Sequence, residues 1–551
     1  MAEREAMVRV ESLAAEEVAA IGSRPDDSPG RAAAASVTDG ASPESEVGEG
    51  SLAARAAWLV AAKGLSFVFA FALPLLLARK MPTAEFGLYK QFTLFAGTAL
   101  TFLPLGVGVS ALYFFGREPE RRRQFACNVL LFHLAVAGAT ALVLGLRPQL
   151  LGSLFSAGEM TELAPLVGLV VLLWVGSAFL EFVAVANKEV KLATAFVVAT
   201  QFSKAAFLLA AALAYGTVRA IVWAAVIHGA LQMLLTLGYL ASRFGPFWRD
   251  FRWAGLRAHL AYALPLGFAS MIFQAQLVLD NYFVSHHYGA ALYAVYAVGC
   301  FQLPLVDLLS ESVAAVTIPR ASYLQKQGRR AEIIDLVART VRKLALAYLP
   351  LYAFLLVAGR EFLLVLFTEK FAASWPVFVV NITLIPLALV ASAYDPVMRA
   401  YAEHRYFLLR LRLCVLALLA FGLWYATPRY GLLGAIITAV SVNAIERLAT
   451  ALKVKRVLGI TRGDLPRFTD LGKTAVAAAA AFAAAFAARS LLPDVRPLYA
   501  LAACAAAFAP VYLCALLALG VLTPEERGLA RRQLARLPRL VARGRAASPT
   551  A

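Results

Sequence analysis

The chain has 551 residues, 61% of which are hydrophobic, and a formal net charge of +18. Soluble globular domains are about 45–50% apolar, so this composition excludes an ordinary soluble protein and indicates a polytopic helical membrane protein. The charge does not indicate nucleic-acid binding, because the basic residues are spread over short loops between apolar runs and form no single patch or stripe.

The N-terminal segment differs in composition from the rest of the chain. Residues 1–55 contain eleven acids and five arginines. Residues 23–51 combine low hydrophobicity with many Pro, Ser, Gly and acidic residues, which is typical of disorder. We therefore expect residues 1–55 to be a disordered, acidic, cytoplasmic tail.

Fourteen apolar stretches follow, and each is long enough for a bilayer-crossing helix of about 20 residues. The expected spans are 57–78, 91–115, 125–146, 163–186, 192–214, 220–242, 259–284, 291–313, 344–366, 376–398, 407–427, 432–452, 474–492 and 498–522. The predicted fold class is an all-α polytopic membrane protein with about 14 transmembrane helices. The expected domains are an N-terminal six-helix bundle at 56–245, a C-terminal six-helix bundle at 246–458 and an additional helix pair at 459–523.

The loops between these spans alternate in basic content. One set, at 116–124, 187–191, 243–258, 319–343, 399–412 and 453–473, contains 27 Lys and Arg residues, whereas the alternate loops contain ten. Basic loops stay in the cytoplasm, so the first set and both termini are predicted to be cytoplasmic. Residues 524–551 are expected to form a basic amphipathic tail lying on anionic lipid headgroups.

The first external loop carries an unusual charge. Residues 78–95 read "ARKMPTAEFGLYKQFTLF", in which Arg79, Lys80 and Lys90 are three of the ten external basic residues. Pro82 and Gly87 are expected to form its turn. The three basic side chains would lie either at an outer mouth, where an anionic head group emerges, or against lipid headgroups.

Part of this loop recurs in the second half of the chain. Leu88-Tyr89 aligns with Leu292-Tyr293, and a prolyl segment follows each pair, at 102–104 and at 302–304. Six spans separate the two copies, so both halves would enter the membrane in the same sense. This spacing predicts parallel repeats related by pseudo-two-fold symmetry about an axis along the membrane normal.

Three stretches carry a resemblance to a known family. They are "LLARKMPTAEFGLYKQF", "LRAHLAYALPLGFASMIFQAQLVLDNYFVSHHYGAALYAVYAVG" and "IPRASYLQKQGRRAEIIDLVARTVRKLAL". Over roughly residues 55–455 the chain resembles the polysaccharide-biosynthesis flippases, which are O-antigen-type exporters of lipid-linked oligosaccharides. Their superfamily also contains the multidrug extruders and the lipid II flippase. In the family a basic residue commonly follows the aspartate late in helix seven, whereas here Asp280 is followed by Asn281.

Polar side chains inside the spans are the candidate site residues. An ionisable side chain at the bilayer centre costs about 2.5–3.5 kcal/mol on insertion scales, so each one indicates a cavity or a partner. The candidates are Lys63, Lys204, Gln276, Asp280, Asp307 and Glu311. Helical spacing places Gln276 with Asp280 on one face of span seven and Asp307 with Glu311 on one face of span eight.

The resemblance implies that spans one, two, seven and eight line a central cavity. In such a cavity, Lys63 and Lys204 would bind a pyrophosphate, while Asp280, Asp307 and Glu311 would bind sugar hydroxyls or a coupling cation, H⁺ or Na⁺. The alternative is that these side chains snorkel to the interface or form structural Lys–acid pairs. We expect no catalytic residue, no metal and no cofactor.

The predicted function is that of a flippase in the bacterial inner membrane. It would move a polyprenyl-pyrophosphate-linked oligosaccharide repeat unit by alternating access, for surface polysaccharide biosynthesis. Its expected partners are membrane lipids and the polysaccharide polymerase and chain-length machinery, with no nucleic acid. One alternative is a cation-coupled multidrug exporter of the same fold, which would favour a more acidic cavity. Another is a membrane-embedded polymerase or ligase, which would typically need a longer external loop than the roughly 16 residues found here.

Overall fold

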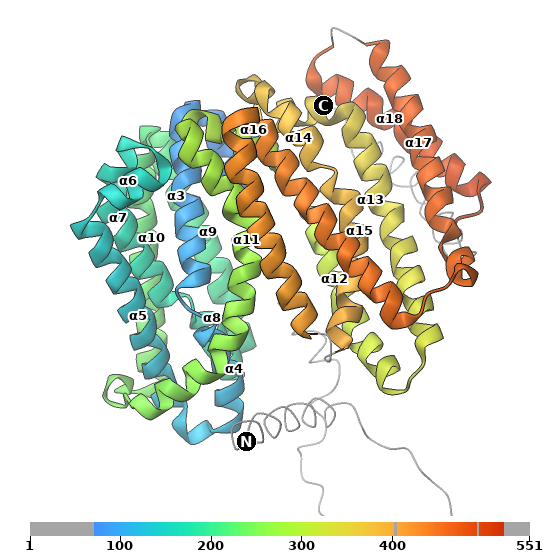
Figure 1. Ribbon diagram of the computed structural model, residues 1–551. Coiled ribbons are helices and arrows are strands. Elements are labelled where there is room, and N and C mark those ends of the chain that lie inside the picture. Colours follow the sequence, from blue (N-terminus) through green and yellow to red (C-terminus); the bar gives the residue numbers. More distant parts are fainter. Residues whose placement is uncertain (1–70, 402–404, 493–494, 523–551) are drawn as a thin grey trace, which may run out of the picture. The chain divides into compact units, whose positions relative to one another are not determined.

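The computed structural model describes residues 71–401, 405–492 and 495–522, and within these ranges the chain forms helices and no strands (Figure 1). Most of the first predicted span, including Lys63, lies outside the described residues, as do the predicted tails at 1–55 and 524–551. A membrane interior leaves backbone N–H and C=O groups no water to bind. The long apolar runs therefore satisfy these groups within helices.

A helical segment at 71–80 comes first in the described chain. The α-helices that follow are α3 (Thr83–Phe102), α4 (Val107–Arg117), α5 (Arg122–Leu146), α6 (Gln149–Phe155), α7 (Gly158–Ser177), α8 (Leu180–Ala186), α9 (Val190–Tyr215), α10 (Val218–Phe244), α11 (Trp253–Gly299), α12 (Pro304–Lys326), α13 (Arg330–Phe367), α14 (Trp375–Asn381), α15 (Leu384–Ala400), α16 (Arg405–Leu458), α17 (Thr469–Ser490) and α18 (Pro497–Ala518). Short 3₁₀ helices include η2 (Phe247–Arg249), η3 (Glu369–Ser374) and η5 (Arg462–Phe468).

Among the described residues, eight helices are long and apolar enough to cross a membrane, or up to ten if two bent pairs each count as one span. The chain is thus a multi-pass, all-helical membrane protein, as predicted, but the predicted number of fourteen is not confirmed. Part of the difference lies in how the spans are divided. Predicted span two is interrupted between α3 and α4, at 103–106, and predicted span eight between α11 and α12, at 300–303.

Two turns between predicted spans are much tighter than predicted. The expected loops at 285–290 and 428–431 shrink to single non-helical residues, Gly289 and Gly431, inside the long helices α11 and α16. Their φ angles are 69° and 68°, a left-handed region that glycine enters without steric cost. The long helix α16 therefore contains two of the predicted spans, whereas α11 contains span seven and the beginning of span eight.

The first hairpin is also tighter than predicted. α3 begins at Thr83, so the turn after the helical segment 71–80 is confined to Met81 and Pro82. Gly87 is not a turn residue, because it lies inside α3 and is buried there. Lys90 is not a loop residue either, because it lies in the second turn of α3. Because Lys90 and Gly87 lie close to Pro82 in the sequence, they gave the pattern of a longer loop.

Helices α3 to α10 form the first half of the described fold. α7 packs against α5, α10 and α3, and its Trp174 ring meets Phe92 of α3 at 6.2 Å between centroids. The Trp174 indole Nε1 donates a hydrogen bond to the carbonyl oxygen of Ala225 in α10, at 3.1 Å. These helices occupy one side of Figure 1, coloured blue to green.

The second half runs from α11 to α16, and α17 and α18 pack beside α13 (Figure 1). The Arg489 Nε atom of α17 lies 2.8 Å from the Glu361 carboxylate of α13. Arg447 and Asp395 form a second interhelical ion pair, between α16 and α15, at 3.4 Å. Among the predicted domains, the additional helix pair is thus attached to α13; the domain boundaries themselves remain predictions.

α11 contacts both halves. It bends by 57° between Trp253–Pro265 and Ser270–Gly299. Before the bend, Asn128 of α5 exchanges two 3.2 Å hydrogen bonds with the backbone of Arg252, immediately before α11, and His259 Nδ1 lies 2.8 Å from the Ser110 hydroxyl of α4. Beyond the bend, α11 packs against α3 and α16. The N-terminal part of α11 therefore packs against the first half, although α11 belongs to the second half of the sequence.

The two halves meet along α3 and α11. Gly87 lies so close to Ala290 that a Cβ atom on it would stand 1.9 Å from the Ala290 carbonyl oxygen. Nearby, the Gln91 amide Nε2 donates a 2.8 Å hydrogen bond to the Ser285 hydroxyl. Both helices end in a short break at a prolyl segment, after Phe102 and after Gly299. The two aligned sequence segments thus form matching elements that pack against each other.

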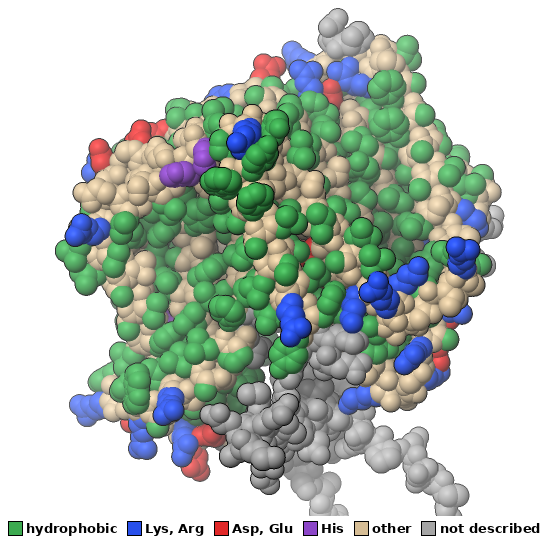
Figure 2. Space-filling model, viewed as in Figure 1, with side chains coloured by type: hydrophobic (Ala, Val, Ile, Leu, Met, Phe, Trp, Pro, Cys, Tyr) green, Lys and Arg blue, Asp and Glu red, His purple; other side chains and the backbone are tan. Residues whose placement is uncertain are grey.

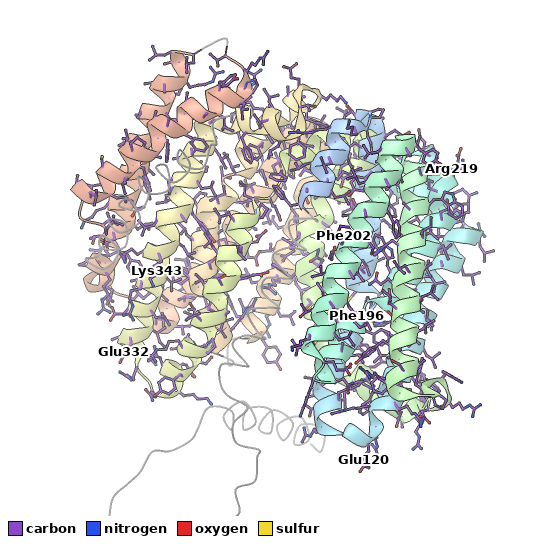
Figure 3. All side chains as sticks on the ribbon, turned by 180° about the vertical axis from the view of Figure 1, so that it is seen from behind. Glu120, Phe196, Phe202, Arg219, Glu332 and Lys343 are labelled. Atoms are coloured by element: carbon purple, nitrogen blue, oxygen red, sulfur yellow. The ribbon has the colours of Figure 1, made fainter. Side chains whose placement is uncertain are left out.

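The loops alternate between two ends of the helices, as the sequence predicts. Figure 3 labels Glu120 and Glu332, from two of the basic loops, at one end and Arg219, from an alternate loop, at the other. In Figure 2, hydrophobic side chains cover most of the visible face, and Lys and Arg gather towards its ends, more at the lower end than at the upper. This distribution is that of a helical protein whose middle band faces lipid.

Candidate functional site

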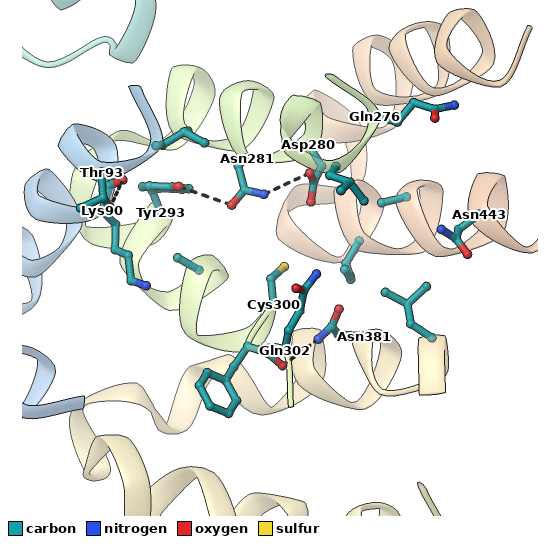
Figure 4. A pocket seen from close by; sticks show the side chains of 17 residues that line it. Lys90, Thr93, Gln276, Asp280, Asn281, Tyr293, Cys300, Gln302, Asn381 and Asn443 are labelled. Carbon is teal, nitrogen blue, oxygen red and sulfur yellow. Dashed lines mark hydrogen bonds between the residues drawn. The ribbon is translucent and has the colours of Figure 1, made fainter. Parts of the chain in front are cut away.

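A cavity of about 410 Å³ lies where α3 meets α11, α15 and α16 (Figure 4). The residues that line it are Lys90, Thr93, Leu94, Gln276, Leu277, Asp280, Asn281, Tyr293, Ala297, Cys300, Phe301, Gln302, Asn381, Leu384, Ile436, Ala439 and Asn443. Three of these come from the first half, and the others come from the second. The volume is within the range of pockets that hold small molecules, about 300–1,000 Å³.

The Asp280 carboxylate is held in place by its neighbours. The Tyr296 hydroxyl donates to one carboxylate oxygen at 2.7 Å, and the Asn281 amide donates to the other at 3.1 Å. The Tyr293 hydroxyl donates in turn to the Asn281 amide oxygen at 3.3 Å. Asp280 is only 8% exposed. A buried carboxylate with two donors has a fixed orientation, and this one faces the cavity.

Lys90 supplies the positive charge in this cavity. It projects from α3 into the cavity, across from the wall of α11 that carries Asp280 (Figure 4). Its ammonium nitrogen lies 5.5 Å from the centre of the Phe86 ring. No ion pair of Lys90 occurs within the described part of the chain. The first half thus contributes a cation, and the second half an anion, to the same space.

Five carboxamide side chains make the rest of the cavity polar: Gln276, Asn281, Gln302, Asn381 and Asn443. The Gln276 amide donates to a backbone carbonyl at 3.1 Å, while its buried oxygen has no hydrogen-bond partner among the described residues. The Asn381 amide also donates to a backbone carbonyl, at 3.2 Å. A carboxamide both donates and accepts hydrogen bonds, and a sugar hydroxyl does the same. Such a lining is chemically suited to a carbohydrate.

The structure brings together two of the candidate residues from the sequence, Asp280 and Gln276. Lys204 lies elsewhere, in a separate cavity of about 130 Å³ inside the first half. Its ammonium stands 4.4 Å above the centre of the Trp174 ring. Asp307 and Glu311 are exposed on α12 and do not line the larger cavity.

Sequence reasoning missed the cavity lysine, and of the five cavity amides it proposed only Gln276 as a site residue. Lys90 was assigned to a loop because it follows Pro82 closely, although Phe86, Leu88 and Tyr89 already mark an apolar helix around it. The candidates inside the spans were mainly charged residues, and Gln276 was the one uncharged side chain among them. Counting Asn and Gln within the spans would have identified all five carboxamides of the lining.

The described chain has a helical membrane fold with a polar cavity between its two halves. This arrangement is that of a transporter-like protein. Within that class, the chain belongs to the polysaccharide biosynthesis protein family, whose model matches residues 76–376. This confirms the family predicted from the three sequence stretches.

A curated relative and two solved structures are similar to the chain. The probable lipid II flippase MurJ of Rhizobium meliloti (strain 1021) is 28% identical over 287 residues, which are 50% of this chain and 50% of that protein. The match thus spans about half the length of the curated relative. A structure of lipid II flippase MurJ in an inward closed conformation has a TM-score of 0.67 and 13% identity, covering 83% of this chain and 97% of that one. An inward-facing multidrug resistance transporter of the MATE family, in the MOP superfamily, has a TM-score of 0.55 and 16% identity, covering 72% and 94%. The two structures share the fold of this chain.

Proposed function

We propose that this protein is a flippase that moves a polyprenyl-pyrophosphate-linked oligosaccharide across the bacterial inner membrane for surface polysaccharide biosynthesis. The observation that carries the proposal is the cavity between the halves, with a cation on α3, a carboxylate on α11 and five carboxamides around them. The family and the similarity to a probable lipid II flippase support it.

In this proposal the sugar part of the substrate enters the cavity, while the polyprenyl tail stays in the bilayer. The amides exchange hydrogen bonds with sugar hydroxyls, and Lys90 attracts the anionic part of the head group. The protein performs no covalent chemistry on its substrate. Movement of α3 against α11 exposes the cavity first to one side of the membrane and then to the other.

The energy source and the orientation belong to the same proposal. Asp280 is the site where a coupling cation, H⁺ or Na⁺, binds, because its carboxylate is the acid that lines the cavity. The basic loops and both termini lie in the cytoplasm. A polysaccharide polymerase and chain-length proteins receive the product at the outer surface.

A complementation experiment in the native host tests this function. Deleting the gene should abolish the surface polysaccharide, and the lipid-linked oligosaccharide should accumulate in the membrane. Wild-type protein should restore export, whereas Lys90→Ala should reduce it at least tenfold at equal protein abundance. Lys80→Ala is the matched control, because Lys80 is an exposed lysine at the end of the preceding helix and lines none of the described cavities.

Two results would contradict the proposal. One is a normal surface polysaccharide with no accumulation of lipid-linked oligosaccharide in the deletion strain. The other is a loss of ethidium efflux in the same strain, which would favour the multidrug exporter, the function of the MATE-family neighbour. Equal export by Lys90→Ala and Lys80→Ala would remove the cavity lysine from the mechanism.

A further inference from the structure

A second group of contacts joins the two halves, at the end opposite the most basic loops. It involves the end of the helical segment 71–80 with the turn after it, and the segment that follows α13. Arg79 and Lys370 belong to these segments and are both exposed. Both belong to the minority of ten basic residues in the alternate loops, so the orientation rule does not account for them.

Arg79 caps a helix of the other half. Its Nε atom donates to the Leu366 carbonyl at 3.1 Å, and its Nη2 atom donates to the Val365 carbonyl. Both carbonyls belong to the last turn of α13, which ends at Phe367. The last carbonyls of a helix lack partners within the helix and carry a partial negative charge. A guanidinium from the first half therefore stabilises the C-terminus of a helix in the second.

Lys370 does the same in the reverse direction. Its ammonium donates to the carbonyl oxygens of Arg79 at 3.4 Å and of Met81 at 3.5 Å. These carbonyls lie at the end of the helical segment 71–80 and in the turn after it. Each half thus provides one cation and one helix end, and the two caps are reciprocal.

A row of aromatic rings connects this contact with the cavity. Phe86 of α3 meets Phe371 at 5.5 Å, and Phe371 meets Phe367 at 6.3 Å. Phe367 meets Phe301 at 5.3 Å, and Phe301 lines the cavity. The ammonium of Lys90 lies over the other end of the row, on Phe86. A change at the cavity that moves Phe301 or Phe86 therefore moves rings that pack beneath the caps.

The backbone between the capped helix end and Lys370 is strained. Thr368 has φ 73° and ψ 172°, a conformation that is essentially confined to glycine. Its hydroxyl is buried and has no hydrogen-bond partner among the described residues. Strained conformations persist only where the surrounding structure enforces them. Here the surroundings are α13, capped by Arg79, and η3, which carries Lys370.

We propose that Arg79 and Lys370, with the carbonyls they cap, form an inter-half latch that closes this end of the cavity and opens when the halves separate. In the closed latch, the strained backbone of Thr368 is the feature that destabilises the closed state. The latch rests on the proposed function only in assuming that the halves move apart, and it would serve an exporter of any substrate.

The rate at which a buried thiol reacts measures the opening of the latch without any transport assay. The reporter is Met81→Cys, because Met81 is fully buried beneath the contact. It is placed in the full-length protein after the five native cysteines have been replaced by alanine. A bulky, polar maleimide reports the rate in detergent, and Glu369→Cys, at an exposed neighbouring position, reports the intrinsic reactivity of the thiol.

Removing the caps should expose the reporter. A cap at a helix C-terminus changes an equilibrium about two- to fivefold, so Arg79→Ala and Lys370→Ala should each raise the Met81→Cys rate by that factor, and the double variant by about their product. Lys80→Ala is the matched control and should leave the rate unchanged. Thr368→Gly should lower the rate below that of the unsubstituted reporter protein, because it relieves strain in the closed latch and keeps both caps.

Two results would overturn the latch. One is a double-variant rate equal to that of Lys80→Ala. The other is a Thr368→Gly rate at or above that of the reporter protein, a test that stands even if the double variant does not fold. If labelling follows the expected pattern but the polysaccharide assay fails, the latch stands and the proposed substrate is wrong.

Discussion

Gly87→Ala should act as a wedge between the two halves. A Cβ at this position would stand 1.9 Å from the Ala290 carbonyl oxygen and 2.4 Å from its carbon. Real Cβ atoms essentially never approach closer than 3.0 Å, so α3 and α11 would have to separate locally by about 1 Å. The clash is with backbone, so no side chain can rotate away from it.

The cost follows from the packing of the contact. Overfilling a packed core typically costs about 1–3 kcal/mol, and here the whole cost falls on the state in which the halves touch. Because 1.4 kcal/mol is a factor of ten, the ratio of closed to open protein should fall by about 5- to 150-fold. If no open state is accessible, the same cost appears as lost stability.

Thermal unfolding in detergent and labelling of a Met81→Cys reporter together distinguish these outcomes. Gly97→Ala is the control, because it lies in the same helix and a Cβ there meets nothing within 4 Å. It should be neutral or slightly stabilising, since alanine favours a helix over glycine by roughly 1 kcal/mol. A Gly87→Ala protein that matches Gly97→Ala in both melting temperature and labelling rate would refute the close contact between α3 and α11.

Three further substitutions test buried polar groups through the melting temperature. Tyr296→Phe should destabilise the protein by about 1–3 kcal/mol, since a buried oxygen of Asp280 loses its hydrogen-bond donor. Asp280→Asn should cost less, because the tyrosine hydroxyl can still donate to the amide oxygen. Equal losses of stability in the two variants would contradict this arrangement. Arg489→Ala should destabilise the protein by about 3 kcal/mol, because it leaves Glu361, which is 5% exposed, as an unpaired buried carboxylate. Glu361→Gln should destabilise it less. The opposite order would exclude the ion pair between Arg489 and Glu361. Lys204→Met should raise the melting temperature, because no ion pair of this ammonium occurs in the described ranges. A fall would show that the contact of the ammonium with the Trp174 ring stabilises the protein.

The sequence determined the helices better than the turns. Long apolar runs must be helical in lipid, so the predicted spans within the described ranges are largely helical, although spans two and eight are each interrupted. The turns depend on single residues whose backbone conformation hydropathy does not record, such as Gly289 and Gly431. The prolyl segments were predicted to lie inside continuous spans, whereas each of them marks a break between two helices, after Phe102 and after Gly299.

The site was harder to predict, because the residues on one face of a helix do not indicate which other helix packs against that face. Thr200, Gln201 and Lys204 all line one cavity. Its neighbours come from within the first half, however, so this cavity is not the one that contains Asp280. Lys90 was missed for a different reason, since a lysine seven residues after the start of a helix looks like part of the preceding loop.

The way α11 begins affects how the protein is made. Synthesis proceeds from the N-terminus, and domains tend to fold in that order, so the first half is complete while residues 253–265 are emerging from the ribosome. Arg252, just before them, finds Asn128 already in place, and His259 finds Ser110, whereas α12 to α16 do not yet exist. The first half therefore holds the N-terminal part of α11 in position and sets its direction, and the second half is assembled on this helix.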